Sequence, residues 1–228
     1  DLIEQALEPL LRANDMQLVV LGTGDQHFHD WLSELRARFP QQLAAFLTFK
    51  AELAQKIYAG SDLFLMPSRS EPCGLGQMIA LRYGSIPLVR ATGGLADTIA
   101  DCDAQPHTGN GFTFADYTPA ALEATLLRAL ARYRRPAEWR ELMLRAMQAD
   151  NSWASSARRY AELYRRASDL TPLDDPRRAQ RGLEAARCRF DTGDFAAAAA
   201  LVRVLLESAT GEVTAAALLL LADLRWYD

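Results

Sequence analysis

Residues 61–99 read SDLFLMPSRSEPCGLGQMIALRYGSIPLVRATGGLADTI. Two apolar runs within this stretch, 62–68 and 86–90, have the length and composition of buried strands. Each run is followed by a glycine-rich corner, EPCGLG or TGG, and then by a helical pattern. Strands that alternate with helices in this way predict a parallel sheet that is covered on both faces.

The same alternation extends over the first half of the chain. Apolar runs at 16–21, 43–49 and 111–114 predict three further strands, and helical patterns occupy 27–39 and 51–59. Continuous apolar strands are typical of parallel sheets that are buried on both sides. We therefore predict an α/β fold with a Rossmann-like parallel sheet.

After residue 114 the pattern is helical only. Thr118 and Pro119 predict the N-cap and the first residue of a helix that continues to about residue 132. Two more helices follow, from 136 to 147 and near 153–167. The polar segment SDLTPLDDP, residues 168–176, predicts a linker because it carries two prolines. We expect two domains, residues 1–170 and residues 171–228.

The second domain is alanine-rich and helical, with the corner DTGDF at 191–195. This corner resembles the inter-helix turn of a tetratricopeptide repeat, and Ala198 would permit close packing there. The resemblance is partial, and a plain helical hairpin is the alternative. About one and a half repeats would fit, so we expect a small, incomplete helical-repeat segment that could bind a protein partner.

Composition and charge exclude several classes of protein. The chain of 228 residues is 50% hydrophobic, which is enough to bury a core, and its net charge of −4 argues against a general nucleic-acid or anionic-membrane binder. The cysteines, Cys73, Cys102 and Cys188, are far apart and lack the spacing of a zinc site, so we expect reduced thiols in a cytoplasmic protein. The apolar run at 214–224 is too short to span a bilayer.

The two glycine-rich corners are candidate binding sites because parallel sheets bind ligands at the carboxyl ends of their strands. Residues 74–76 would form the first turn of a helix, whose free N–H groups suit phosphate or sugar oxygens. Glu71 precedes that turn, where a carboxylate can accept hydrogen bonds from sugar hydroxyls or stabilise positive charge on a sugar carbon. Capping of the helix by Glu71 is an equal alternative on spacing alone.

The second corner, Thr92-Gly93-Gly94, has the same position after the next strand. Two such corners side by side suggest one ligand with a diphosphate between them. A third turn, Gly22-Thr23-Gly24, lacks the full spacing of a dinucleotide fingerprint and a fitting downstream acid. A nicotinamide site is therefore not expected.

These residues together resemble the donor-binding half of bacterial glycogen synthases and plant starch synthases. The motifs EPCGL, RYG and TGGLADT carry the resemblance, which extends from residue 1 to about residue 167. It implies the C-terminal half of a GT-B fold and a retaining glucosyltransferase. That family transfers glucose from ADP-glucose, or UDP-glucose in some members, to the non-reducing end of an α-1,4-glucan, and it uses no metal or other cofactor.

The resemblance also implies roles for individual residues. Glu71 matches the catalytic-site glutamate, which contacts the donor glucose and stabilises an oxocarbenium-like transition state. Cys73, Gly74 and Leu75 match the turn whose backbone meets the sugar hydroxyls. The implied diphosphate loop comprises Thr92, Gly93 and Gly94, and Phe49 stands where the family stacks an aromatic ring on adenine.

Some of the family pattern is absent. A second glutamate of the wider GT-B pattern is replaced by Ile79, as in the starch synthase branch, and Gly76 replaces a commoner threonine. The acceptor domain and the basic residues that neutralise the diphosphate would lie before residue 1. We therefore expect this chain alone not to turn over.

Two alternatives stay open at this point. One is a GT-B glycosyltransferase with a different donor or acceptor. The other is a non-catalytic interaction module in which the Rossmann-like unit is a scaffold.

Overall fold

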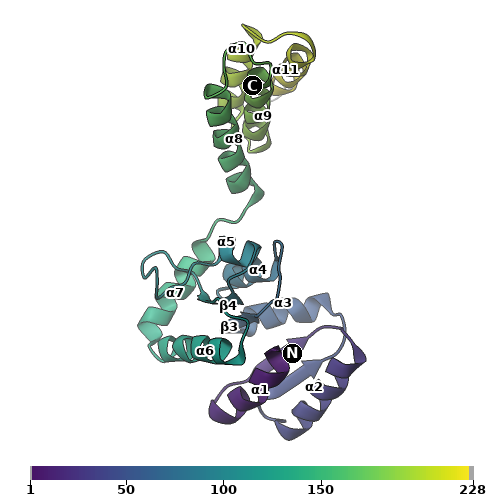
Figure 1. Cartoon of the computed structure of the whole chain (residues 1–228), viewed down its shortest axis with the longest axis vertical. Coiled ribbons are helices and arrows are strands. Elements are labelled where there is room, and N and C mark those ends of the chain that lie inside the picture. The colour runs from purple at the N-terminus through teal and green to yellow at the C-terminus, as the bar shows by residue number, and fades with distance from the viewer. Residues whose placement is uncertain (1, 226–228) are drawn as a thin grey trace. The chain divides into compact units, whose positions relative to one another are not determined.

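The computed structural model describes residues 2–225 and divides into two compact units, Asp1–Ala149 and Asp150–Asp228. The first unit alternates helices with parallel strands, and the second is all helix, as Figure 1 shows in purple to teal and in green to yellow. The predicted α/β fold class is confirmed. Among the described residues, no helix combines the length and apolar character needed to cross a membrane.

The first unit contains all five predicted strands. Its elements are α1 (Leu2–Ala13), β1 (Leu18–Leu21), α2 (Gln26–Arg38), β2 (Leu43–Phe46), α3 (Ala51–Gly60), β3 (Leu63–Met66), α4 (Gly76–Tyr83), β4 (Ile86–Arg90), α5 (Gly94–Thr98), β5 (Phe112–Phe114), α6 (Pro119–Tyr133) and α7 (Pro136–Gln148). The second unit contains α8 (Trp153–Asp169), α9 (Arg177–Asp191), α10 (Phe195–Leu206) and α11 (Gly211–Leu224). The Thr118 hydroxyl caps α6 by accepting from the N–H of Ala121, as the sequence predicts.

The strands are parallel, but they form two sheets where the sequence predicts one. β1 pairs with β2, and β3, β4 and β5 form the second sheet in that order. Each sheet has its own core, and the apolar face of α1 divides between them. Leu7 and Leu11 pack with the first sheet, whereas Leu2, Ala6 and Leu10 pack with the second. Hydrophobic patterning identifies buried strands but does not specify which of them share hydrogen bonds.

The boundary between the units lies earlier than residue 170, because α8 packs against α9 in the second unit. The predicted linker, 168–176, comprises the last residues of α8 and a short, hydrogen-bonded connection from residue 170 to residue 176. Arg178 Nη1 donates to the carbonyl of Thr171 at 2.6 Å, and Arg181 Nη1 donates to the carbonyl of Ala167 at 3.2 Å and to the Thr171 hydroxyl. Thr171 is buried. Prolines and aspartates mark turns as well as linkers, so composition alone could not separate the two.

The predicted corner at 191–195 connects α9 to α10. Asp194 caps α10 by accepting from the N–H of Ala197, and its second oxygen accepts from Arg189 at 3.1 Å. Ala198 is fully buried in a core shared by α9, α10 and α11. In the second unit, α9 and α10 therefore form a pair of helices joined by a capped turn.

A carboxylate in the first unit fastens the loop between α5 and β5. Asp101 accepts hydrogen bonds from the N–H groups of Thr113 and Asp103 and from Arg128, which also pairs with Asp103 at 2.5 Å. Burial, the largest single influence, would raise the pKa of Asp101. The hydrogen bonds from Arg128 and the two backbone groups together outweigh burial and lower this pKa to about 2.

We expect Asp101→Asn to lower the free energy of unfolding by about 1–2 kcal/mol at pH 7, after allowance for solvent screening. Because the folded pKa lies below the unfolded value of about 3.9, this stabilisation is present above about pH 4 and is lost as the pH falls towards 2. Urea unfolding across this range measures the difference. The exposed Asp15→Asn is the control, and an Asp101→Asn deficit that persists unchanged at pH 2 would contradict the assignment.

Candidate functional site

The predicted site lies where two neighbouring strands end. β3 leads through residues 67–75 into α4, and β4 leads through residues 91–93 into α5. Because β3 and β4 are parallel and hydrogen-bonded, their carboxyl ends meet at one edge of the sheet. The structure thus brings Glu71, Cys73, Gly74 and Leu75 to the same edge as Thr92, Gly93 and Gly94.

The two corners interlock through backbone atoms. The N–H of Gly94 donates to the carbonyl of Glu71 at 3.1 Å. A Cβ atom on Gly94 would lie 2.2 Å from the carbonyl oxygen of Cys73, and one on Gly93 would lie 2.0 Å from that of Glu71. Gly93 also has a φ of 46°, which side chains rarely permit. Only glycine at both positions allows this contact.

Gln77, which is not among the predicted site residues, fastens the corners through its side-chain amide. Its side chain is fully buried, and Nε2 lies 3.1 Å from the carbonyl oxygen of Cys73 and 2.9 Å from that of Gly74. Nε2 also lies 3.1 Å from the Thr98 hydroxyl, which donates to the carbonyl of Gly94 at 2.7 Å. The network therefore runs from α4 to α5. A polar residue in the first turn of an apolar helix was the only signal in the sequence.

Backbone donors at the corners remain free. The N–H groups of Gly74, Leu75 and Gly93 make no hydrogen bond within residues 2–225. Cys73 and Leu75 are exposed, and Gly93 is exposed as well. The arrangement therefore offers donors from both loops to a ligand with several oxygen atoms.

The carboxylate of Glu71 is similarly free. Glu71 is half-buried, and within the described part of the chain its side chain has no hydrogen bond or ion pair. The capping alternative is thus not supported, because the N-cap of α4 is Leu75 and no side-chain oxygen bonds to that end of the helix. An unpaired carboxylate can accept hydrogen bonds from hydroxyl groups or face a developing positive charge.

Arg90 also supports the corners, a role that the sequence pattern did not indicate. Nη1 donates to the carbonyl of Arg69 at 2.7 Å, and Nε donates to the carbonyl of Ala115 at 3.0 Å. Its guanidinium lies over the ring of Tyr117. One cation at the end of β4 therefore fixes the loops that follow β3 and β5.

Phe49 is the one predicted site residue that the structure does not join to the corners. It follows β2, in the other sheet, and its side chain is 85% exposed. The helix that begins after it, α3, is held near α4 because the Tyr83 hydroxyl donates to Gln55 at 2.6 Å and the rings of Tyr58 and Tyr83 stack. The Phe49 ring is thus exposed to solvent just before α3, a helix that these contacts hold in place.

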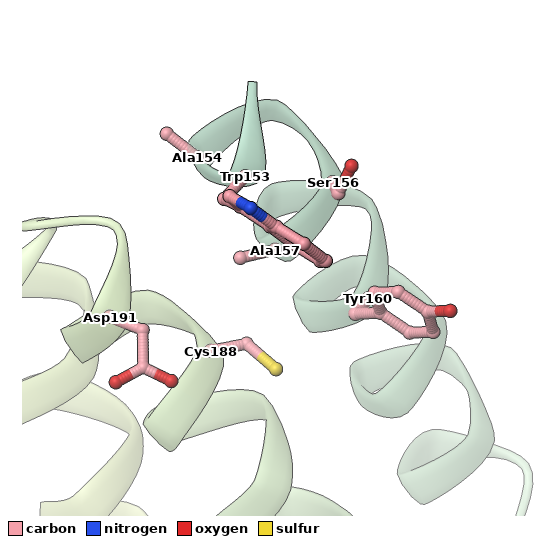
Figure 2. A pocket seen from close by; sticks show the side chains of 7 residues that line it. All are labelled: Trp153, Ala154, Ser156, Ala157, Tyr160, Cys188 and Asp191. Atoms are coloured by element: carbon pink, nitrogen blue, oxygen red, sulfur yellow. The ribbon is translucent and has the colours of Figure 1, made fainter. Parts of the chain in front are cut away.

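A separate hollow of about 260 Å³ lies in the second unit and holds none of the predicted site residues. Figure 2 shows Trp153, Ser156 and Tyr160 on α8 and Cys188 and Asp191 on α9 around it. Trp153 is 91% exposed. Among the described residues, no hydrogen bond joins the side chains that line this hollow, in contrast to the network that Gln77 forms.

Comparisons with known proteins agree with the geometry of the first unit. The family model described as Glycosyl transferases group 1 matches residues 1–142. A glycogen synthase from Syntrophotalea carbinolica is 58% identical over 170 residues, which cover 75% of this chain and 35% of that protein. One from Moorella thermoacetica is 54% identical over 168 residues, or 73% of this chain and 34% of that protein.

A solved structure is also similar. The catalytic domain of starch synthase IV from Arabidopsis thaliana, bound to ADP and acarbose, superimposes with a TM-score of 0.65 at 38% identity. The match covers 73% of this chain and 35% of that one. The chain spans about a third of the length of the curated relatives that it matches.

Proposed function

The chain belongs to the glycosyl transferases group 1 family, and from that premise we propose that its first unit binds the nucleotide-sugar donor of a retaining glucosyltransferase of the glycogen and starch synthase class. The donor is ADP-glucose, with UDP-glucose as the alternative, and the acceptor is the non-reducing end of an α-1,4-glucan. Identities of 54–58% to glycogen synthases support this class. ADP in the similar starch synthase structure supports an adenine donor.

The observation that carries the proposal is the pair of interlocked corners with unused N–H groups. In our proposal, the loop of Thr92, Gly93 and Gly94 holds the diphosphate, with the free N–H of Gly93 as its backbone donor, since the N–H groups of Thr92 and Gly94 already donate to the carbonyls of Arg90 and Glu71. The backbone of Cys73, Gly74 and Leu75 meets the glucose hydroxyls. Oxygen-rich ligands of high negative charge suit such donors, because backbone N–H groups in loops that are held by other contacts need little reorganisation to bind them.

Glu71 is the proposed catalytic residue. As the bond from glucose to the diphosphate breaks, positive charge develops on the sugar ring and its anomeric carbon. A free carboxylate beside the ring stabilises that charge, while the corners hold the departing diphosphate. Retention requires that the acceptor attack from the same face that the diphosphate leaves.

The length of the relatives supports a further part of the proposal, which concerns acceptor binding and turnover. Since this chain spans about a third of them, we propose that acceptor binding and turnover belong to a longer protein and that this chain alone does not turn over. The second unit is proposed to be a tetratricopeptide-like segment that binds a protein partner. Three free cysteines support the proposed cytoplasmic location.

Calorimetric titration of the chain with ADP-glucose, UDP-glucose and ADP tests the proposed donor. Tighter binding of ADP-glucose and ADP than of UDP-glucose is the expected result. Binding of UDP-glucose alone would indicate a glycosyltransferase with another donor. The absence of any nucleotide binding would favour the scaffold alternative and overturn the proposal.

We expect Phe49→Ala to weaken ADP-glucose binding about tenfold or more, because stacking of a base on an aromatic ring contributes about 1–3 kcal/mol. The free energy of unfolding should not change, since the ring is 85% exposed. Titration calorimetry measures the affinity. Trp153→Ala, which removes another exposed ring, is the control and should leave the affinity unchanged. Equal affinities for Phe49→Ala and the parent chain would remove Phe49 from the site.

A further inference from the structure

The last helix of the second unit, α11, is apolar on two opposite sides. Its inner side buries Ala217, Leu220 and Leu224 against α9 and α10. Its outer side exposes Ala215, Leu218, Leu219 and Ala222 to solvent, and Leu219 is 69% exposed. Surface helices ordinarily carry polar residues on the side away from the core. The outer side of α11 is therefore suited to contact another surface.

The outer residues fall on one stripe, since their spacing of three, one and three matches the turn of a helix. The stripe is also symmetric about the midpoint between Leu218 and Leu219. Ala215 and Ala222 lie at equal distances from that midpoint, and so do Glu212 and Arg225 farther out. Both charged residues are exposed, and neither has an ion-pair partner among residues 2–225.

We propose that α11 pairs in antiparallel fashion with α11 of a second copy of this chain, around a two-fold axis through that midpoint. Two-fold pairing requires a surface that complements itself, and the symmetric stripe has this property. Leu218 would contact Leu219 of the other copy, and the alanines would let the helix backbones approach closely. Glu212 would lie at the same end as Arg225 of the other copy.

Two further effects favour the antiparallel direction. The positive N-terminal end of each helix dipole lies beside the negative C-terminal end of the other. In a parallel pair, Glu212 would face Glu212 of the other copy, and Arg225 would face Arg225 of the other copy, which places like charges together. The arrangement therefore selects a second copy over a partner of unrelated charge.

The expected dimer is weak. One pair of helices buries less surface than a standard stable interface, so we expect association in the micromolar range rather than the nanomolar range. Sedimentation velocity of the chain between about 1 μM and about 1 mM should show a reversible shift from monomer to dimer. A monomer throughout this range would overturn the proposal.

Variants locate the interface. Leu219→Glu should weaken the dimer about a hundredfold or more, because it places two carboxylates beside the axis. Leu173→Glu, another exposed leucine in the same unit, should have no effect. A dimer that survives Leu219→Glu, or that is instead abolished by Trp153→Ser with Tyr160→Ser on α8, would assign the contact to another surface and overturn the proposal.

Charge reversal tests the direction of pairing without touching the apolar stripe. Glu212→Arg and Arg225→Glu should each weaken the dimer about tenfold, because each places like charges at both ends. The double variant should restore most of the affinity, since it exchanges the two charges. Failure of the double variant to recover would exclude the antiparallel arrangement. Circular dichroism of each variant verifies that the helices remain folded.

Discussion

Replacing Gly94 with alanine is expected to destabilise the first unit by about 3 kcal/mol and to weaken ADP-glucose binding about a hundredfold or more. The added Cβ atom would lie 2.2 Å from the carbonyl oxygen of Cys73 and 2.5 Å from its Cα. Both are backbone atoms, so neither can move aside by a side-chain rotation. The loops must separate, and the hydrogen bond from the Gly94 N–H to Glu71 is strained or lost. Urea unfolding and titration calorimetry measure the two effects.

Gly24→Ala is the matched control. Gly24 also lies in a turn between a strand and a helix of the same unit, but apart from its own residue and its two chain neighbours no heavy atom lies within 4 Å of the position that its Cβ would take. We expect this variant to keep the stability and the donor affinity of the parent chain. If the two alanine variants behaved alike, the corners would not be interlocked in solution.

Gln77→Leu is expected to cost about 2–4 kcal/mol of folding free energy, although leucine is similar in size. The substitution removes the donor that serves the carbonyls of Cys73 and Gly74 and leaves both facing a buried apolar side chain without a partner. Because these carbonyls belong to the turn proposed to meet the sugar, the affinity for ADP-glucose should fall as well. Urea unfolding and titration calorimetry again provide the readouts.

The exposed Gln55→Leu serves as the control, since within residues 2–225 the Gln55 side chain accepts one hydrogen bond, from Tyr83, at the surface. Its expected cost is below about 1 kcal/mol. A double-mutant cycle with Thr98→Val then tests the network itself. Coupling of at least about 0.5 kcal/mol between residues 77 and 98 is expected, and strictly additive effects would show that the two corners are not linked through Gln77.

Much of the first unit could be predicted from sequence because its signals are local. The apolar run at 86–90 forms β4 without any change of boundary, and Thr118 caps α6 as its residue type suggests. Pairing between strands is not local, and so the division into two sheets was missed. The segment 168–176 was misread for a related reason, because the arginines that hold it as a turn lie in the following helix.

For the candidate site, the sequence predicted the positions of the two corners but not the contacts between them. Glycines in EPCGLG and TGG indicated two flexible corners after neighbouring strands, and parallel topology placed them together. The pattern could not reveal that the corners touch, since a glycine shows where a side chain is absent but not which atoms fill its place. Gln77 was missed because burial of an amide depends on carbonyls that sequence alone does not orient. Roles for Glu71 and Phe49 stay predictions, and the Phe49→Ala titration tests the second of them.

The contact between the two corners is made by peptide groups and by glycines that lack side chains, and this has a consequence for directed evolution. Ser70 and Ala91, which flank the contact, are exposed and contribute no atom to it. A combinatorial library at these two positions could therefore change the rim of the proposed sugar site while the backbone contact keeps its geometry. The fold in this way separates a fixed backbone contact from neighbouring side chains that selection can vary.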